Sequence, residues 1–286
     1  MRGPMALGGV MAATASLSLG LGLVIARRLT RPSRTRRFDL SIRAVEQDGD
    51  RQVIVLDRTH QTESPGEFTL LFQGGHWVQL SAEVLDRGSG RLARAVTATA
   101  PGFTPSADDR ASWSGIYFMT PADAGLSAYD VAIPTPSGPA PAWRIDGSDS
   151  QSTRWAIHIH GLGSPRAGTL RGVQVTTDVG YTSLIVSYRN DGEGPRRGSG
   201  RSTLGATEVE DVDAAIQYAI DQGAREVVLF GWSMGAQVAL QLAGRPRYGA
   251  LIAGIVLESP VLDWVATIKA NCARAGLPAA AGLLAL

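Results

Sequence analysis

Four short apolar runs divide the second half of the chain, and stretches long enough for helices separate them. They are Trp155–His160, Ser183–Tyr188, Glu226–Phe230 and Gly254–Glu258. Continuous apolar runs of this length are typical of strands that are buried on both faces, as in a parallel sheet. Strands that alternate with helices predict an α/β fold with right-handed crossovers.

One of the intervening helices has clear ends. Thr207-Glu208-Val209-Glu210 has the pattern of a capping box, in which the threonine and the second glutamate satisfy free backbone N–H groups. The apolar residues behind it repeat at helical spacing, and Gly223 is a typical C-terminal stop. The sequence therefore predicts a helix that starts after Thr207 and ends before Gly223.

The pattern before residue 128 is different. Residues 38–100 hold short strand-like segments, and Asp48-Gly49-Asp50 and Gly74-Gly75 each separate two of them. Such turns predict two β-hairpins in a small β-rich region. Residues 101–127 are rich in Pro, Ser, Ala and Asp and are expected to form a linker, so that the α/β region comprises residues 128–286.

The N-terminus has 24 uncharged residues, 3–26, followed by six arginines up to Arg37. About 20 apolar residues cross a bilayer, and flanking positive charge tends to remain cytoplasmic. Residues 1–37 are therefore expected to be an uncleaved single-pass membrane anchor with a basic juxtamembrane stretch, and the body is expected in the cytoplasm. A cleaved signal peptide, with an exported body, and a buried helix are the alternatives.

The distribution of charge supports this division. Residues 1–37 carry a net charge of +7, whereas the other 249 residues carry −6. This pattern predicts a membrane or another anionic partner at the N-terminus only, and it argues against nucleic-acid binding by the body. The composition excludes a disordered chain and a collagen, and the single Cys272 excludes a disulfide framework.

Candidate chemistry lies at Ser233. The sequence Gly231-Trp232-Ser233-Met234-Gly235 follows one predicted strand directly and precedes an apolar helical stretch. This is the G-x-S-x-G nucleophile elbow in the strand–turn–helix context that it requires, where crowding leaves no room for side chains at the two glycines. The alternative is a glycine-rich turn whose serine caps the helix.

A second motif agrees with the first. His160-Gly161-Leu162-Gly163 follows the strand at Trp155, and the backbone N–H groups of Leu162 and Met234 could together stabilise a developing oxyanion. With these two motifs, residues 128–270 resemble the α/β-hydrolase superfamily, in particular its serine esterase, monoacylglycerol-lipase-like and prolyl-oligopeptidase-like branches. The resemblance implies hydrolysis of a small-molecule ester or acyl substrate, with amides and peptides as alternatives, and no metal or organic cofactor.

The rest of a catalytic triad is missing. A serine nucleophile needs a histidine base and an acid, which in the resembled superfamily follow it in the order Ser, acid, His. All four histidines precede Ser233, and the only acids after it are Glu258 and Asp263. Asp263 is the candidate acid, or else the N-cap of a helix. The chain is therefore expected to be a C-terminally truncated hydrolase with little activity of its own, or an inactive α/β-hydrolase-fold binding module.

Three smaller expectations complete the site. In the resembled families the histidine at the position of His160 orients its loop. His158 and His160 are two residues apart on one predicted strand, so they should point the same way, but no third metal ligand accompanies them. Asp191 follows a strand at the sheet edge that binds ligands in open α/β sheets, and it also has the context of a turn residue.

Overall fold

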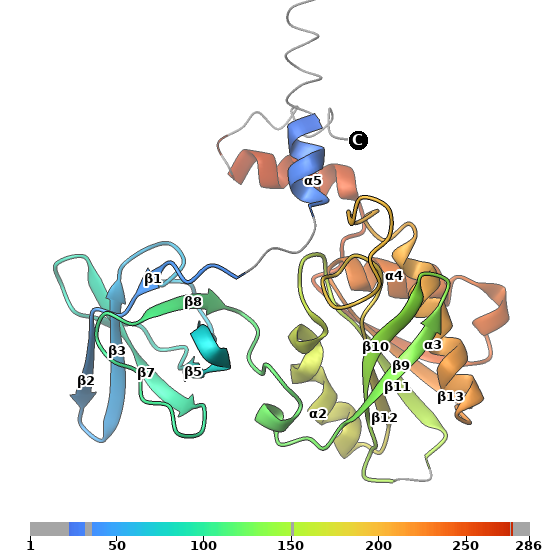
Figure 1. Cartoon of the computed structure of the whole chain (residues 1–286), viewed down its shortest axis with the longest axis horizontal. Helices are drawn as coiled ribbons and strands as arrows, with labels where there is room; N and C mark the ends of the chain where they lie inside the picture. Colours follow the sequence, from blue (N-terminus) through green and yellow to red (C-terminus); the bar gives the residue numbers. More distant parts are fainter. Residues whose placement is uncertain (1–22, 32–35, 150–151, 275, 277–286) are drawn as a thin grey trace, which may run out of the picture.

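The computed structural model describes residues 23–31, 36–149, 152–274 and 276, and two separate sheets organise them (Figure 1). The first is an eight-stranded antiparallel sheet in the β-rich region, with the order β1-β8-β4-β5-β7-β3-β2 and β6 paired with β7. Its strands are β1 (Leu40–Ser41), β2 (Ala44–Asp48), β3 (Arg51–Asp57), β4 (Phe68–Phe72), β5 (Trp77–Leu80), β6 (Leu85–Asp86), β7 (Arg91–Thr99) and β8 (Arg110–Ser114).

Both predicted hairpins of this region are confirmed. β2 and β3 pair with Asp48 opposite Arg51, and β4 and β5 pair with Leu71 opposite Trp77. The linker predicted over residues 101–127 is wrong at its centre, because β8 lies within it and pairs with both β4 and β1. Its Ala-Ser-Trp-Ser sequence is too polar to be recognised as a strand from its composition.

The second sheet has six strands in the order β14-β13-β11-β12-β10-β9. They are β9 (Tyr129–Thr135), β10 (Gly138–Ile145), β11 (Arg154–Ile159), β12 (Thr182–Val186), β13 (Glu226–Trp232) and β14 (Ile252–Glu258). The α/β fold is confirmed, with one correction: the sheet is mixed. β11 to β14 run parallel, whereas the β9–β10 hairpin joins them antiparallel through β10 and β12.

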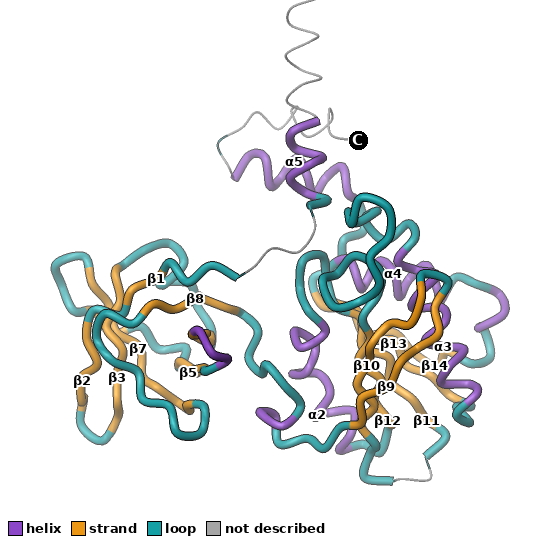
Figure 2. Tube along the Cα trace, viewed as in Figure 1, coloured by secondary structure: helices purple, strands orange, loops and turns teal. Residues whose placement is uncertain are grey.

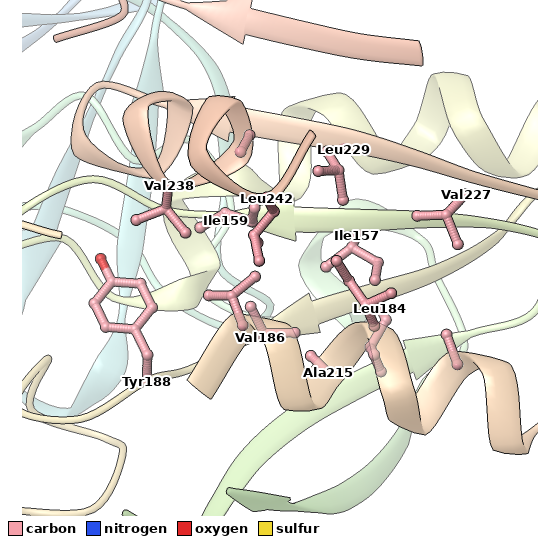
Figure 3. Close-up of a cluster of buried hydrophobic side chains, with 14 of the residues drawn as sticks. Ile157, Ile159, Leu184, Val186, Tyr188, Ala215, Val227, Leu229, Val238 and Leu242 are labelled. Carbon is pink, nitrogen blue, oxygen red and sulfur yellow. The ribbon is translucent and has the colours of Figure 1, made fainter. Parts of the chain in front are cut away.

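Helices cover both faces of this sheet (Figure 2). One face packs against α3 (Glu208–Asp221) and α4 (Met234–Ala243) and forms the larger apolar core, part of which Figure 3 shows. The other face packs against α2 (Leu170–Asp178), and α5 (Trp264–Arg274) follows β14 in the chain. The described residues also contain four short 3-10 helices, at Gln73–Gly75, Ala122–Ala124, Arg166–Thr169 and Pro246–Tyr248.

β14 is the edge strand of the second sheet. Within the described residues it pairs only with β13, and Ile255 and Val256 are 38% and 45% exposed. By contrast, the interior parallel strands β11 and β12 are buried throughout, apart from Arg154 at the start of β11. The apolar run of residues 254–258 predicted that β14 would be buried, but two of its apolar side chains are exposed. Within the described residues, no strand pairs with the edge of β14 that faces away from β13.

The predicted membrane anchor lies mostly outside the described residues. Residues 23–29 are helical, and Thr30 ends this helix by donating from its N–H to the Ala26 carbonyl. In the described part of the chain, no helix has the length and the apolarity that are needed to cross a membrane.

The core of the β-rich region contains a fully buried cation, Arg94. Its guanidinium donates to backbone carbonyls of the 62–66 loop and of the 81–82 segment, and it lies 5.5 Å from the ring centre of Phe68 and 5.4 Å from that of Trp113. Burial lowers the pKa of Arg94, but the group has no carboxylate partner within the described residues. The charge is thus compensated by carbonyl dipoles and π-faces.

Candidate active site

Ser233 lies at the turn between β13 and α4, with φ 54° and ψ −112°. This backbone conformation is strained for a residue with a side chain. The backbone around the turn holds it in place, because the N–H of Ser233 donates to the Glu258 carbonyl at 2.8 Å and the N–H of Ala236 donates to the Ser233 carbonyl at 3.1 Å. Ser233 is half-buried, and its hydroxyl has no hydrogen-bond partner among the described residues.

Three glycines make room for this turn. A Cβ on Gly231 would overlap the backbone of Ala236, and one on Gly235 would overlap the Ile159 carbonyl. A Cβ on Gly161 would lie 3.1 Å from the Ser233 Cβ, so the loop after β11 approaches the serine closely. The backbone around Ser233 therefore leaves no room for a side chain at Gly231 or Gly235, as the G-x-S-x-G motif predicts.

The loop after β11 forms a tight turn beside the serine. The N–H of Ser164 donates to the Gly161 carbonyl at 3.2 Å, and Gly163 has φ 70°, which fits a type II turn. The backbone N–H groups of Leu162 and Met234 have no acceptor among the residues that the structure describes, and both residues line one small cavity. Two residues with free N–H groups, from different loops, thus line the same cavity, and one of them, Met234, directly follows Ser233.

His160 is buried under this loop. Its Nε2 lies 3.0 Å from Oδ2 of Asp191, and its Nδ1 lies 3.0 Å from the hydroxyl of Tyr188. The Tyr188 ring stacks on the imidazole at 4.2 Å between ring centres, and the Tyr188 hydroxyl also donates to the His160 carbonyl at 2.9 Å. His160 is therefore held on both ring nitrogens, and it has no hydrogen bond to Ser233.

Asp191 and Tyr188 have opposite protonation tendencies. Burial on its own raises the pKa of Asp191, but the hydrogen bond from His160 and those from the N–H groups of Gly194 and Tyr188 outweigh it and lower that pKa below its ordinary value. Burial raises the pKa of Tyr188 well above its ordinary value. Asp191 thus stays ionised and accepts from the Nε2–H of His160, while Tyr188 stays protonated and donates.

His158 occupies a different environment from His160. Its ring packs on Phe230, at 4.9 Å between ring centres, and its Nε2 lies 3.3 Å from the hydroxyl of Thr176 on α2 and 3.3 Å from that of Ser183 on β12. The expectation that the two histidines point the same way is wrong, because β11 ends at Ile159 and strand alternation stops there. Burial lowers the pKa of His158 to about 3, so this ring is neutral.

Asp263, the candidate triad acid, is exposed and caps α5. Its Oδ1 accepts from the N–H groups of Val265 at 2.7 Å and Ala266 at 3.2 Å. No hydrogen bond in the described ranges joins it to Ser233 or to a histidine. The structure thus places Asp263 in the alternative role that the sequence left open, the N-cap.

A buried carboxylate that the sequence did not single out, Glu208, lies at the start of α3. It accepts from the hydroxyl of Ser202 at 2.6 Å, from the N–H of Thr203 at 2.8 Å and from the N–H of Gly205 at 3.1 Å. Ser202 and Glu208 line the cavity that Leu162 and Met234 border. The capping box predicted here does not form, because the Thr207 hydroxyl pairs with Thr203 instead.

Beside the elbow, a larger cavity of about 400 Å³ lies on the α2 face of the sheet. Gly231, Trp232 and Glu258 line it together with Phe230 and Arg171. Among the described residues, no group of three or more His, Cys, Asp or Glu side chains is placed to hold a metal ion. The charged side chains in this lining are those of Arg171 and Glu258, and Ser233 directly follows the lining residue Trp232.

Comparisons with known proteins agree with this geometry at the level of the family. Residues 156–286 match the family described as "Alpha/beta hydrolase family", and residues 41–114 match one described as "Domain of unknown function (DUF8805)". No curated protein matches the chain.

Among solved structures, the chain is similar to an esterase of Pyrococcus furiosus, with 25% identity and a TM-score of 0.47 over 56% of this chain and 63% of the esterase. It is also similar to a bacterial heroin esterase, with 20% identity and a TM-score of 0.41 over 51% of this chain and 49% of that one. A serine hydrolase without a lid from Xanthomonas campestris gives 21% identity and a TM-score of 0.36 over 41% and 56% of the two chains. The chain thus spans less than two thirds of the length of each of these proteins.

Proposed function

Residues 156–286 belong to the α/β-hydrolase superfamily, and from this premise we propose that the protein is a serine hydrolase that acts on carboxylic esters. One observation carries the proposal: Ser233 sits in a strained turn with a free hydroxyl, beside two free backbone N–H groups. Strain and unsatisfied donors are expected where a structure is organised for chemistry rather than for stability.

The proposed reaction begins with attack of the Ser233 Oγ on the ester carbonyl carbon. The carbonyl oxygen becomes negative and is met by the N–H groups of Leu162 and Met234, with additional stabilisation from the N-terminus of α4. The proton of the Ser233 hydroxyl passes to solvent as Oγ attacks, and collapse of the tetrahedral intermediate breaks the ester C–O bond and expels an alkoxide that takes a proton from solvent to become the alcohol. The acyl group remains on Ser233 until water cleaves it to the carboxylic acid. Removal of one oxyanion donor typically slows such a reaction by about 100- to 1,000-fold.

The general base is not among the described histidines. His158 is buried and neutral, and His160 is bound to Asp191 and Tyr188. His60 and His76 belong to the β-rich region, where the His76 ring stacks on Phe103. None of the four histidines of this 286-residue chain is placed to protonate the leaving group, so the chain on its own should acylate fastest with esters that have good leaving groups.

The proposal includes attachment to a membrane. The 24 uncharged residues 3–26 and the arginines that follow them support a single-pass anchor at the cell membrane with a cytoplasmic body. Export of a cleaved form is the alternative. Digestion of the body by an external protease in spheroplasts would contradict the cytoplasmic orientation.

Acyl-enzyme trapping tests the catalytic proposal. The 286-residue chain is incubated with a p-nitrophenyl ester, with and without added imidazole as an external base, and its peptides are mapped by mass spectrometry. We expect the acyl group on the peptide that contains Ser233, and imidazole should increase the yield because it supplies the missing base.

Two variants control this experiment. Ser233→Ala removes the nucleophile and should abolish acylation, whereas Ser199→Ala removes an exposed loop serine and should leave it unchanged. Failure of the wild-type chain to acylate even with imidazole would contradict the proposal.

That outcome would favour the second candidate function, an inactive α/β-hydrolase-fold module that binds a partner. The observation in its favour is that none of the described histidines is hydrogen-bonded to Ser233.

A further inference from the structure

Two segments that are far apart in the sequence lie against each other near the candidate site. They are the helix of residues 23–29 with its C-terminal turn, and the loop of residues 195–201. Nη1 of Arg201 donates to the Arg27 carbonyl at 2.6 Å and to the Thr30 hydroxyl at 3.3 Å. The N–H of Ser202 donates to the Thr30 carbonyl at 3.1 Å. The two segments therefore form one surface.

Asn190 fixes the loop in this position. Its Nδ2 donates to the Arg201 carbonyl and its Oδ1 accepts from the Arg197 N–H, both at 2.8 Å. The N–H of Gly200 closes a turn on the Arg197 carbonyl at 2.9 Å. The arginines on the loop are thus presented on a preformed backbone.

The charge of this surface is one-sided. Six arginines belong to it, and none of them pairs with a carboxylate in the part of the chain that the structure describes: Arg27, Arg28, Arg31, Arg196, Arg197 and Arg201. We call this set the basic surface. The neighbouring acids Asp191 and Glu208 are buried and held by internal hydrogen bonds. By contrast, Arg43, Arg58 and Arg87 in the β-rich region all form ion pairs.

We propose that the basic surface docks on the anionic phospholipid headgroups of a membrane. Planar guanidinium groups bind phosphate oxygens in pairs, and unpaired arginines beside a bilayer are attracted to its negative surface potential. The uncharged residues 3–26 precede the surface directly, so the bilayer is the anionic partner that this position favours. Residues 38–286 carry a net charge of −6 even with the three loop arginines included, and repulsion between the acidic part of the body and the lipid orients the basic surface towards the bilayer.

The docked orientation also brings one side of the candidate site towards the bilayer. Arg31 lines the small cavity that the free donors of Leu162 and Met234 border. The basic surface is therefore continuous with the oxyanion side of the site, which would face the bilayer. The docking does not depend on hydrolysis, and it adds a second membrane contact to the proposed anchor.

The test measures how close the loop comes to lipid. In the full chain with Cys272→Ser, Ser199→Cys carries an environment-sensitive fluorophore at an exposed position of the loop. Vesicles of phosphatidylcholine, with or without phosphatidylglycerol, contain a spin-labelled lipid that quenches the probe at short range. We expect quenching with the anionic vesicles at low salt, its loss at high salt, and little quenching with neutral vesicles.

Matched variants separate the surface from net charge. Arg196→Gln with Arg197→Gln should raise the lipid concentration for half-maximal quenching roughly 25-fold, about fivefold per arginine. Arg91→Gln with Arg225→Gln removes the same charge at exposed positions in other parts of the molecule. This double variant should change the lipid concentration for half-maximal quenching less than about threefold.

Three results would overturn the proposal. The first is quenching with neutral vesicles that equals the quenching with anionic vesicles, which would show that the anchor alone brings the loop to the lipid. The second is an equal effect of the two double variants on the lipid concentration for half-maximal quenching. The third is an absence of quenching with any vesicle. Binding to duplex DNA, which carries no quencher, is followed by the change in emission of the fluorophore. An emission change with DNA as large as that with unlabelled anionic vesicles would overturn the assignment of the basic surface to lipid.

Discussion

The two sheets stabilise buried charge in different ways. In the β-rich region, Arg94 is compensated by backbone carbonyls of the 62–66 loop and by two aromatic rings. In the α/β domain, Arg189 forms a bidentate pair with Asp211 at 2.7 and 2.8 Å, and His160 pairs with Asp191. The difference is that the β-rich region uses no ionisable partner for its cation, whereas the α/β domain uses partners that titrate.

This difference predicts which changes should destabilise the β-rich region and which should destabilise the α/β domain. Loss of Arg94 leaves carbonyls without donors, and loss of Arg189 leaves a carboxylate without its cation. Acid should affect the α/β domain first, because its buried groups change protonation while an arginine does not.

The largest effect is expected for Arg94→Met. It removes every donor to the carbonyls of Thr62, Ser64 and Gly66, and unsatisfied buried acceptors cost about 1–3 kcal/mol each. We expect a loss on the order of 5 kcal/mol, measured by chemical denaturation, with faster hydrogen exchange in residues 62–66. Arg91→Met, at an exposed position of the same strand, is the control, and equal stability of the two variants would remove the role given to Arg94.

A somewhat smaller effect is expected for Arg189→Met. Asp211 is fully buried, so the variant leaves an unpaired charge and should cost about 3–5 kcal/mol. Combining it with Asp211→Leu should restore part of the stability, which a double-mutant cycle measures. Equal losses for the single and the double variant would show that the pair, rather than the orphaned carboxylate, carries the energy.

Acidification should weaken the α/β domain through His158. Its folded pKa of about 3 lies below the ordinary 6.5, so its contribution is present above pH 6.5 and is lost as pH falls towards 3. Between pH 6.5 and 4.5 the expected loss is about 2 kcal/mol. Denaturation curves at the two pH values should show a smaller difference in His158→Gln than in the wild type, and identical differences would exclude His158 as the cause.

The depressed pKa of Asp191 predicts a later acid step. Its contribution is present above its ordinary pKa of 3.8 and is lost as pH falls through its lower folded value. The acid loss above pH 4.5 should therefore be nearly the same in Asp191→Asn and in the wild type.

The smallest effect is expected for Asp263→Ala. Loss of the cap of α5 should cost about 1 kcal/mol, while Asp263→Asn should keep most of the capping. Neither variant should change the acylation of Ser233, measured by peptide mapping. A large drop in acylation in both variants would instead support Asp263 as a catalytic acid.

The features that the sequence predicted depend on local rules. The apolar runs marked β11 to β14, and the glycines at 231 and 235 marked the turn at Ser233, because period and crowding are properties of short segments. The bounds were less accurate: β11 ends at Ile159, one residue before the predicted end, and His160 contacts Tyr188 and Asp191 instead of the residues that surround His158.

The features that it did not predict depend on partners far along the chain. Thr62 and Arg94 are 32 residues apart, and His160 and Asp191 are 31 apart, so neither pair leaves a spacing pattern that can be recognised. Glu208 has a pattern typical of helix starts, and only the loop that folds over it makes it a buried acceptor. The polar strand β8 is specified by its neighbours β4 and β1 rather than by its own composition.

The backbone of Ser233 has a consequence for mutation and selection. At φ 54° and ψ −112°, a serine stores strain of roughly 1–3 kcal/mol that a glycine would release. Most substitutions at a buried turn reduce stability, but Ser233→Gly should increase it. A lineage in which the hydroxyl had no use would therefore drift towards glycine at this position. Retention of the serine keeps a less stable fold, which selection tolerates only where the hydroxyl has a function.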